Sequence, residues 1–386
     1  MVKPGIDKLD EYLYLFDNKR VGLITNPTGL NSNFVSSIDL FNEKTNLKAM
    51  FSCEHGVRAN NQAGQKFASY IDEKTNVIVH SLYGKSKKPS KEMMDEIDIV
   101  AVDILDVGSR FYTFIYTLAY MMIACKENNK PIVVFDRPNP CNASTVEGTI
   151  LDMKYRSFIG YFPIVQRHGM TIGEIAKLFN EEYGINCDLT VVKMEGYKRE
   201  MYYEDTGMLW VMPSPNFPTI ETSLTYNSTC IFEGTNIEEG RGTTAPFQIV
   251  GAPFIDPYLY SDKLNSLNLP GVYFRPTYFR PTFSKYPNID CAGVEVHVLD
   301  RNKYQAVKVG FAMFQLIRDL YPDKLEITPP YKEGMHTMLA YNIANSDILD
   351  NKLSLEEQFK LVDEDTEKFK KVREKYLLYK EEKNEN

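Results

Sequence analysis

The sequence predicts an α/β fold, in which a parallel sheet covered by helices on both faces is followed by a smaller α+β domain. In the first half, short continuous apolar runs alternate with segments of helical periodicity, a pattern typical of parallel strands buried on both faces. Between about residues 210 and 290, prolines and aromatic residues are dense and helical periodicity is absent. The length of 386 residues also favours two domains. We therefore expect a boundary near residue 225, between domains of 1–225 and 226–386.

The elements of the first domain follow from these patterns in chain order. Apolar residues at helical spacing predict helices at 6–16, 34–41 and 112–126. Apolar runs of strand length predict strands at 21–24, 47–51, 77–79, 97–104 and 132–135. Thr171 and Glu174 have the spacing of a capping box, which predicts the start of a further helix.

The second domain is expected to mix strands and helices. Alternation of valines with polar residues at 294–298 predicts a half-buried strand, and apolar spacing over 304–314 predicts a helix. Ser354 and Glu357 form a second capping-box pattern, so a C-terminal helix with a solvated Lys- and Glu-rich face is expected.

The composition argues against several classes of protein. Acidic residues exceed basic residues by 52 − 44 = 8, which disfavours nucleic acid or an anionic membrane as partner. No apolar run reaches the roughly 18 residues that cross a bilayer. The acidic N-terminal stretch does not resemble a signal peptide, so we expect a cytoplasmic protein, or an exported one if a leader was removed. Six scattered cysteines without a C-x-x-C pair fit a reducing compartment.

Sequence motifs for the common cofactors are missing as well. No G-x-G-x-x-G follows the first predicted strand, no complete phosphate-binding P-loop occurs, and the five histidines never form H-E-x-x-H. We therefore expect no cofactor and no metal site. Carboxylates can act without a cofactor, and glycoside hydrolysis is the leading example of such chemistry.

Polar side chains follow every predicted strand of the parallel sheet. Ligands bind at the carboxyl ends of such strands, so these loops are expected to form one polar pocket. The candidate residues are Asn26, Glu54, His55, Arg58, Tyr83, Asp106, Arg110 and Arg137.

Glu54 is the strongest catalytic candidate in this set. It would lie beyond an apolar strand, beside His55, where partial desolvation suits a carboxyl group to general acid catalysis. A structural ion pair between Glu54 and Arg58 explains the same residues equally well. For Asp106 the structural explanation is stronger, because it can cap the following helix and pair with Arg110.

The second domain contains two glycine-rich polar stretches, at 233–236 and 239–244, and the latter includes Glu239 and Arg241. Glycines beside charged residues let a ligand approach the backbone closely. They suit an ordinary tight turn equally well.

A series of longer motifs runs through nearly the whole chain. They are GLITNPTG (22–29), EHGVR (54–58), QAG (62–64), SLYGK (81–85), DVGSRFYTFI (106–115), DRPNP (136–140), VEGTILD (146–152), RHGMTIGE (167–174), SPNFPT (214–219) and EGTNIEEGRGTT (233–244). In this order they resemble the NamZ/YbbC-like exo-β-N-acetylmuramidases, long catalogued as a domain of unknown function. Two stretches depart from the usual family pattern: Cys53 replaces proline, and 59–61 reads Ala-Asn-Asn in place of Gly-Asp-Ala.

The resemblance implies a Rossmann-like N-terminal domain, a smaller C-terminal domain and an active site in the cleft. It implies an enzyme that releases N-acetylmuramic acid (MurNAc) from the non-reducing ends of peptidoglycan fragments, for cell-wall turnover or recycling. Glu54 takes the place of the family's proposed catalytic acid. The implied pocket residues are Asn26, His55, Arg58, Gln62, Tyr83, Asp106, Arg110 and Arg137, with Glu239 and Arg241 from the second domain.

We expect Glu54 to protonate the glycosidic oxygen and Asp106 to be the second catalytic group. Asp106 would either activate water or orient the 2-acetamido group of a muropeptide or MurNAc-GlcNAc substrate, where GlcNAc is N-acetylglucosamine. The lactyl carboxylate of MurNAc would be bound by one of four arginines: Arg58, Arg110, Arg137 or Arg241.

Two alternative functions stay open at this point. The first is a non-catalytic muropeptide-binding protein that uses the same cleft. The second is a Mg²⁺-dependent phosphoryl-transfer enzyme in which Asp103, Asp106 and Asp136 hold the ion.

Overall fold

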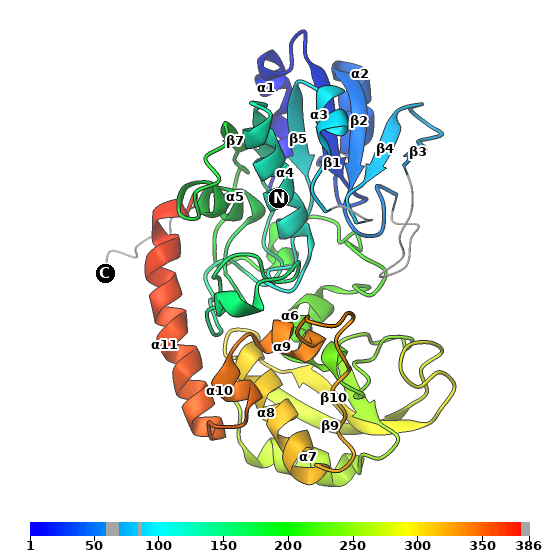
Figure 1. The fold of residues 1–386 in the computed structure, drawn as a ribbon, viewed down its shortest axis with the longest axis vertical. Helices are drawn as coiled ribbons and strands as arrows, with labels where there is room; N and C mark the ends of the chain where they lie inside the picture. Colours follow the sequence, from blue (N-terminus) through cyan, green and yellow to red (C-terminus); the bar gives the residue numbers. More distant parts are fainter. Residues whose placement is uncertain (59–68, 84–86, 380–386) are drawn as a thin grey trace.

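The computed structural model describes residues 1–58, 69–83 and 87–379. It contains a seven-stranded sheet of order β3-β4-β2-β1-β5-β6-β7 and a three-stranded sheet of order β8-β10-β9. The two sheets form the two halves of the molecule in Figure 1, and helices pack around both. The predicted α/β class with a second, smaller domain is confirmed.

The large sheet is parallel except where β3 pairs with β4. Its two faces are buried, because adjacent strand residues such as Leu23 and Ile24 belong to two different apolar clusters. The strands are β1 (Arg20–Thr25), β2 (Asn46–Ser52), β3 (Tyr70–Ile71), β4 (Ile78–Ser81), β5 (Ile99–Asp103), β6 (Ile132–Phe135) and β7 (Leu189–Val192).

The helices around this sheet lie close to the predicted positions. The α5 helix begins at the predicted capping box of Thr171 and Glu174, and α4 is buried along most of its length. The first predicted helix is instead a short α-helix between two 3₁₀ turns, and Phe34 lies before α2 with φ of 61°. The elements are η1 (Gly5–Lys8), α1 (Leu9–Tyr12), η2 (Leu13–Leu15), α2 (Ser37–Lys44), α3 (Lys91–Asp95), α4 (Phe114–Glu127), η3 (Met153–Tyr155), α5 (Ile172–Glu181) and η4 (Tyr203–Thr206).

The second sheet is antiparallel. Its strands are β8 (Ile249–Ala252), β9 (Val272–Phe279) and β10 (Cys291–Val298). The surrounding helices are α6 (Ile220–Thr229), η5 (Cys230–Gly234), α7 (Pro257–Ser266), α8 (Ala306–Leu320), α9 (Met338–Ile343), α10 (Ser346–Leu349), α11 (Leu355–Arg373) and η6 (Glu374–Tyr376). Of the helices in the described part, none is long and apolar enough to span a bilayer.

The α6 helix begins before the expected boundary at 225 and packs on α8. It was not visible in the sequence because serines and threonines, including Thr222 and Ser228, occupy buried positions along it. An apolar stripe therefore does not mark this helix.

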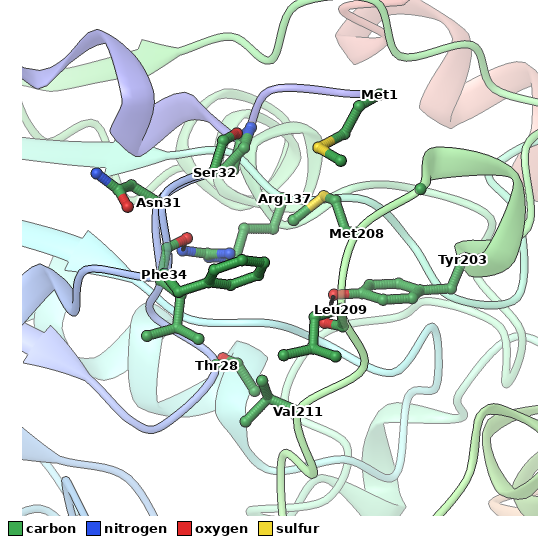
Figure 2. Close-up of a pocket in the computed structure, with 13 residues that line it drawn as sticks. Met1, Thr28, Asn31, Ser32, Phe34, Arg137, Tyr203, Met208, Leu209 and Val211 are labelled. Carbon is green, nitrogen blue, oxygen red and sulfur yellow. Dashed lines mark hydrogen bonds between the residues drawn. The ribbon is translucent and has the colours of Figure 1, made fainter.

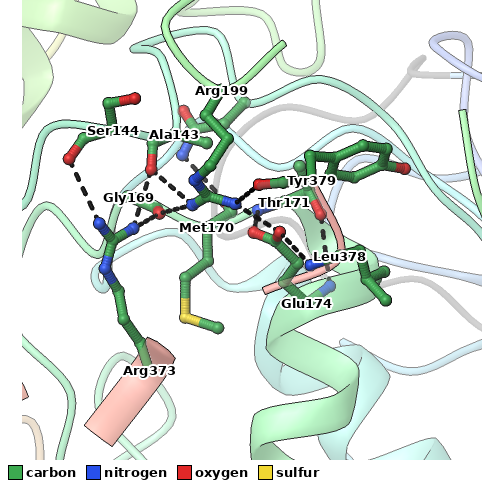
Figure 3. Close-up of polar contacts among 12 residues, drawn as sticks. Ala143, Ser144, Gly169, Met170, Thr171, Glu174, Arg199, Arg373, Leu378 and Tyr379 are labelled. Atoms are coloured by element: carbon green, nitrogen blue, oxygen red, sulfur yellow. Dashed lines mark hydrogen bonds and ion pairs between the residues drawn. The ribbon is translucent and has the colours of Figure 1, made fainter. Parts of the chain in front are cut away.

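The chain returns to the first domain at its C-terminal end. Figure 1 shows α11 running alongside the molecule from the second domain back to the first. Arg373, at the end of α11, donates to the carbonyl oxygens of Ala143 (2.8 Å) and Gly169, as Figure 3 shows. The two domains are therefore joined both by the segment before α6 and by the end of the chain.

Candidate active site

A cavity of about 280 Å³ lies between the two domains. Apolar and aromatic walls with a few polar groups are typical of ligand sites. The first domain contributes Glu54, His55, Tyr83, Phe111, Tyr112, Thr113 and Ile159; the connecting segment contributes Ser214, Asn216 and Phe217; and the second domain contributes Tyr226, Glu233, Arg241, Phe247 and Met338. Two carboxyl groups and one guanidinium from separate parts of the chain therefore meet at one site.

Glu54 reaches this cavity because the chain turns sharply after β2. His55 has φ of 78° and Gly56 has φ of 84°, so two successive residues adopt the left-handed conformation. For a residue with a side chain this costs about 1–3 kcal/mol, although histidine tolerates it better than most. Strain of this kind is concentrated at functional sites. The turn at His55 is thus a structural sign that the position of Glu54 matters.

Two hydroxyl groups hold the Glu54 carboxylate. Thr113, just before α4, donates from Oγ1 to Glu54 Oε2 over 3.2 Å. The hydroxyl of Tyr83, just after β4, donates a second hydrogen bond to Glu54. Burial, together with the nearby Glu54 charge, raises the pKa of Tyr83, so this phenol remains a hydrogen-bond donor at neutral pH.

Glu233 is the second carboxyl group of the cavity and lies on η5. Burial raises its pKa, and the charges of Glu239 and Glu54 add to this, while its ion-pair partner Arg241 opposes the shift. The Glu54 carboxylate is thus close enough to contribute to the raised pKa of Glu233. A carboxyl group with a raised pKa in a cavity is suited to donating a proton.

Glu233 belongs to a cluster in which three carboxyl groups share two cations. Arg241 pairs with Glu233 and also lies 3.4 Å from Glu239. Lys285 pairs with Glu239, and its backbone nitrogen donates to Glu238 over 3.0 Å. Burial and the neighbouring Glu239 raise the pKa of Glu238. Retaining one proton in this cluster relieves its excess negative charge.

Most of the chain matches one protein family. The family models for the N-terminal and C-terminal parts of the exo-β-N-acetylmuramidase NamZ match residues 21–221 and 224–379. The chain belongs to the NamZ family.

Three related proteins are similar to this chain over nearly its full length. The chain is 49% identical over 381 residues to the peptidoglycan β-N-acetylmuramidase NamZ of Bacillus subtilis (strain 168), covering 98% of this chain and 91% of that protein. Two crystal structures of DUF1343 family proteins from Bacteroides fragilis NCTC 9343 are also similar. The first has a TM-score of 0.88 and 36% identity, covering 98% of this chain and 99% of the other. The second has a TM-score of 0.80 and 32% identity, covering 99% and 100%.

Four of the residues expected at the site line the NamZ-family cavity: Glu54, His55, Tyr83 and Arg241. Glu239 is buried behind Arg241 and supports it. Asn26 accepts from Thr28 at the end of β1, and its amide lies 3.5 Å from the carbonyl of Pro213, next to the cavity residue Ser214. Gln62 and the departure at 59–61 lie outside the described residues.

Asp106 does not line the cavity. His168 Nδ1 accepts a hydrogen bond from the Met170 nitrogen, so the ring hydrogen is on Nε2. His168 Nε2 donates a hydrogen bond to Asp106 over 3.0 Å. The Gly108 nitrogen donates to the same carboxylate over 2.8 Å. These bonds order the loop after β5, so Asp106 supports that loop from outside the cavity lining.

Three of the arginines expected to bind substrate also lie elsewhere. Arg58 forms a bidentate pair with Asp72, with both bonds at 3.0 Å. Arg110 is fully buried and donates to the carbonyl of Asn342 in the second domain over 2.5 Å. Each guanidinium is thus directed toward a partner outside the cavity lining.

Arg137 lies in a different pocket. It forms a bidentate pair with Asp103 at 2.5 and 2.8 Å. Figure 2 shows it among Phe34, Met208 and Leu209, which line a small pocket of about 40 Å³. Arg137 therefore links the ends of neighbouring loops and does not line the cavity that contains Glu54 and Glu233.

The three aspartates considered for Mg²⁺ have separate partners. Asp103 pairs with Arg137, Asp106 bonds to His168, and Asp136 accepts from Thr171 and other donors. Among residues 1–58, 69–83 and 87–379, no group of three His, Cys, Asp or Glu side chains has the arrangement of a metal site.

The most important residue that the sequence analysis did not select is Glu233. It stands at the start of the EGTNIEEGRGTT motif, from which the family resemblance implied only Glu239 and Arg241 as site residues. The aromatic residues Tyr112 and Phe217 were also not selected, although they lie in the motifs DVGSRFYTFI and SPNFPT. Only their common position around one cavity distinguishes them.

Proposed function

We propose that this chain is an exo-β-N-acetylmuramidase that removes terminal MurNAc from the non-reducing ends of peptidoglycan fragments. The observation that carries the proposal is the meeting of Glu54 and Glu233 at one interdomain cavity in a member of the NamZ family. Two carboxyl groups flanking the scissile bond are the usual requirement for glycoside hydrolysis. The relative from Bacillus subtilis is named as a peptidoglycan β-N-acetylmuramidase.

The two carboxyl groups have different roles in this proposal. Glu233, whose pKa is raised by burial, gives its proton to the glycosidic oxygen as the bond from that oxygen to the MurNAc anomeric carbon breaks. Glu54, positioned by Thr113 and Tyr83, stabilises the positive charge on the sugar and directs either water or the 2-acetamido group to the anomeric carbon. This division differs from the sequence-based expectation, in which Glu54 was the acid and Asp106 its partner.

Arg241 is the residue we assign to the lactyl carboxylate. It is the arginine that lines the cavity, whereas Arg58, Arg110 and Arg137 are directed elsewhere. A planar guanidinium can donate two parallel hydrogen bonds to a carboxylate, which would distinguish MurNAc from GlcNAc.

Two disaccharides with opposite linkage order test the function. We expect free MurNAc to be released from MurNAc-β-1,4-GlcNAc, with no cleavage of GlcNAc-β-1,4-MurNAc, as measured by chromatography of the products. Saturable binding without product, measured by calorimetry, would instead indicate the non-catalytic binding protein. Loss of the activity with EDTA would contradict a mechanism that uses carboxyl groups alone.

Replacing Arg241 by Met is expected to move the basic limb of the pH profile to higher pH. Arg241 lowers the pKa of Glu233, so its removal raises that pKa further. A proton donor loses activity as pH rises through its pKa, and a higher pKa therefore extends activity toward alkaline pH. The measurement is kcat/KM against pH, with Arg241→Lys as the charge-preserving control. A limb that stays in place or moves to lower pH would argue against Glu233 as the donor.

We place this reaction in the cytoplasm, on imported wall fragments. All six cysteines are free and buried, which suits a reducing compartment. Cell fractionation followed by detection of the protein tests this assignment, and recovery with the exported proteins would contradict it.

A further inference from the structure

A second hollow shares the lining residue Glu233 with the cavity. It has a volume of about 830 Å³ and is more open to solvent than the cavity. All residues around the second hollow belong to the second domain. Glu233 is the residue of this set that also lines the cavity. We call this second space the open groove; the residues that matter in it are Glu233, Phe254, Lys285, Tyr286, Lys324 and Thr328.

The walls of the open groove are fixed by the fold of the second domain. Phe254 follows β8, and its ring packs against Tyr321 at 5.7 Å between centroids. The Thr328 nitrogen donates to the Gly234 carbonyl over 2.9 Å, which joins the wall of the groove to the end of η5. The groove therefore has a defined position relative to Glu233, the residue before Gly234.

The chemistry of the groove suits a carbohydrate chain. Phe254 and Tyr286 are partly exposed aromatic side chains, and such rings can pack against the apolar face of a sugar. Lys324 is exposed, and its ammonium lies 5.9 Å from the centre of the Phe254 ring. Polar groups around an aromatic surface can bind hydroxyl, acetamido and carboxylate groups of amino sugars.

We propose that the open groove binds the sugar units on the leaving-group side of the scissile bond, so that a glycan chain runs from the cavity past Glu233 into the groove. This inference rests on the proposed function. An enzyme that removes one terminal sugar needs a confined site for that sugar and an open path for the rest of the chain. The group that protonates the glycosidic oxygen must lie where these two sites meet, and Glu233 occupies that position.

Substrates of different length test the groove. The series is an aryl β-MurNAc glycoside, MurNAc-GlcNAc and a tetrasaccharide that begins with MurNAc. For Phe254→Ala we expect KM to rise about fivefold to tenfold for the tetrasaccharide, corresponding to one lost packing contact, with less change for the disaccharide and little for the aryl glycoside. Lys324→Ala changes an exposed side chain, and we expect a smaller rise with the same dependence on length.

The matched control is Tyr258→Ala, because Tyr258 is an exposed aromatic residue of the second domain that lines neither space. Equal effects on all three substrates, or unchanged KM for the tetrasaccharide in both Phe254→Ala and Lys324→Ala, would overturn the groove while leaving the proposed function intact. A wild-type protein that cleaves none of the three substrates would overturn both.

Discussion

Glu233→Gln is expected to reduce the turnover of MurNAc-GlcNAc by about 10²- to 10⁴-fold, the usual contribution of general acid catalysis. The sugar leaving group has a high pKa and must be protonated as the bond breaks. An activated aryl glycoside, such as a 2,4-dinitrophenyl glycoside, leaves without a proton. The same variant should therefore lose much less activity on that substrate, and the comparison of kcat between the two substrates measures the role of Glu233.

Glu54→Gln should behave differently, because its proposed role does not depend on the leaving group. We expect a large loss of kcat on both substrates. Glu221→Gln makes the same chemical change at an exposed position and is the control for nonspecific effects. The opposite pattern, in which Glu54→Gln spares the activated substrate and Glu233→Gln does not, would assign the proton to Glu54 and reject the division of roles proposed here.

Arg199→Met is expected to lower the free energy of unfolding by about 3–5 kcal/mol, the usual cost of removing one partner from a buried ion pair. Arg199 and Glu174 are both buried, and their atoms Nη1 and Oε1 are 2.5 Å apart. Arg199 also donates to the carbonyls of Ala143 and Gly169, at 2.6 and 2.9 Å (Figure 3). Methionine fills similar space but leaves the Glu174 charge without its guanidinium.

Urea denaturation followed by circular dichroism measures this loss. Arg280→Met is the matched control, since Arg280 forms a solvent-exposed pair with Asp290 and its loss should matter far less. An effect of Arg199→Met no larger than that of the control would show that the buried pair is not a major source of stability.

The sequence predicted five of the seven strands of the large sheet, because their signals are local, and it did not predict β3 and β7. Continuous apolar runs marked strands such as β1 and β5, and the rule that strand-end loops share one edge brought Glu54, His55 and Tyr83 to one site. The capping boxes at Thr171 and Ser354 were confirmed for the same reason, since four adjacent residues carry the whole signal.

The remaining features depend on contacts between distant residues. The sequence indicated Arg58 and Arg137 as pocket residues. In the structure Arg58 forms an ion pair with Asp72, and Arg137 forms one with Asp103. Glu233 becomes a candidate only when the second domain is placed against the first. A local sequence pattern does not show which charged residues form ion pairs or how the two domains pack together. Both of these determine which residues line the cavity.

The returning chain end has a consequence for dissection of the molecule. The nitrogen of Leu378 donates to Glu174 over 2.8 Å, and the Tyr379 hydroxyl donates to Asp136 over 2.7 Å. A fragment cut at the junction near residue 225 would deprive these buried carboxylates of donors supplied by the last residues of the chain. We therefore expect an excised N-terminal half to be less stable than the same residues are in the full chain.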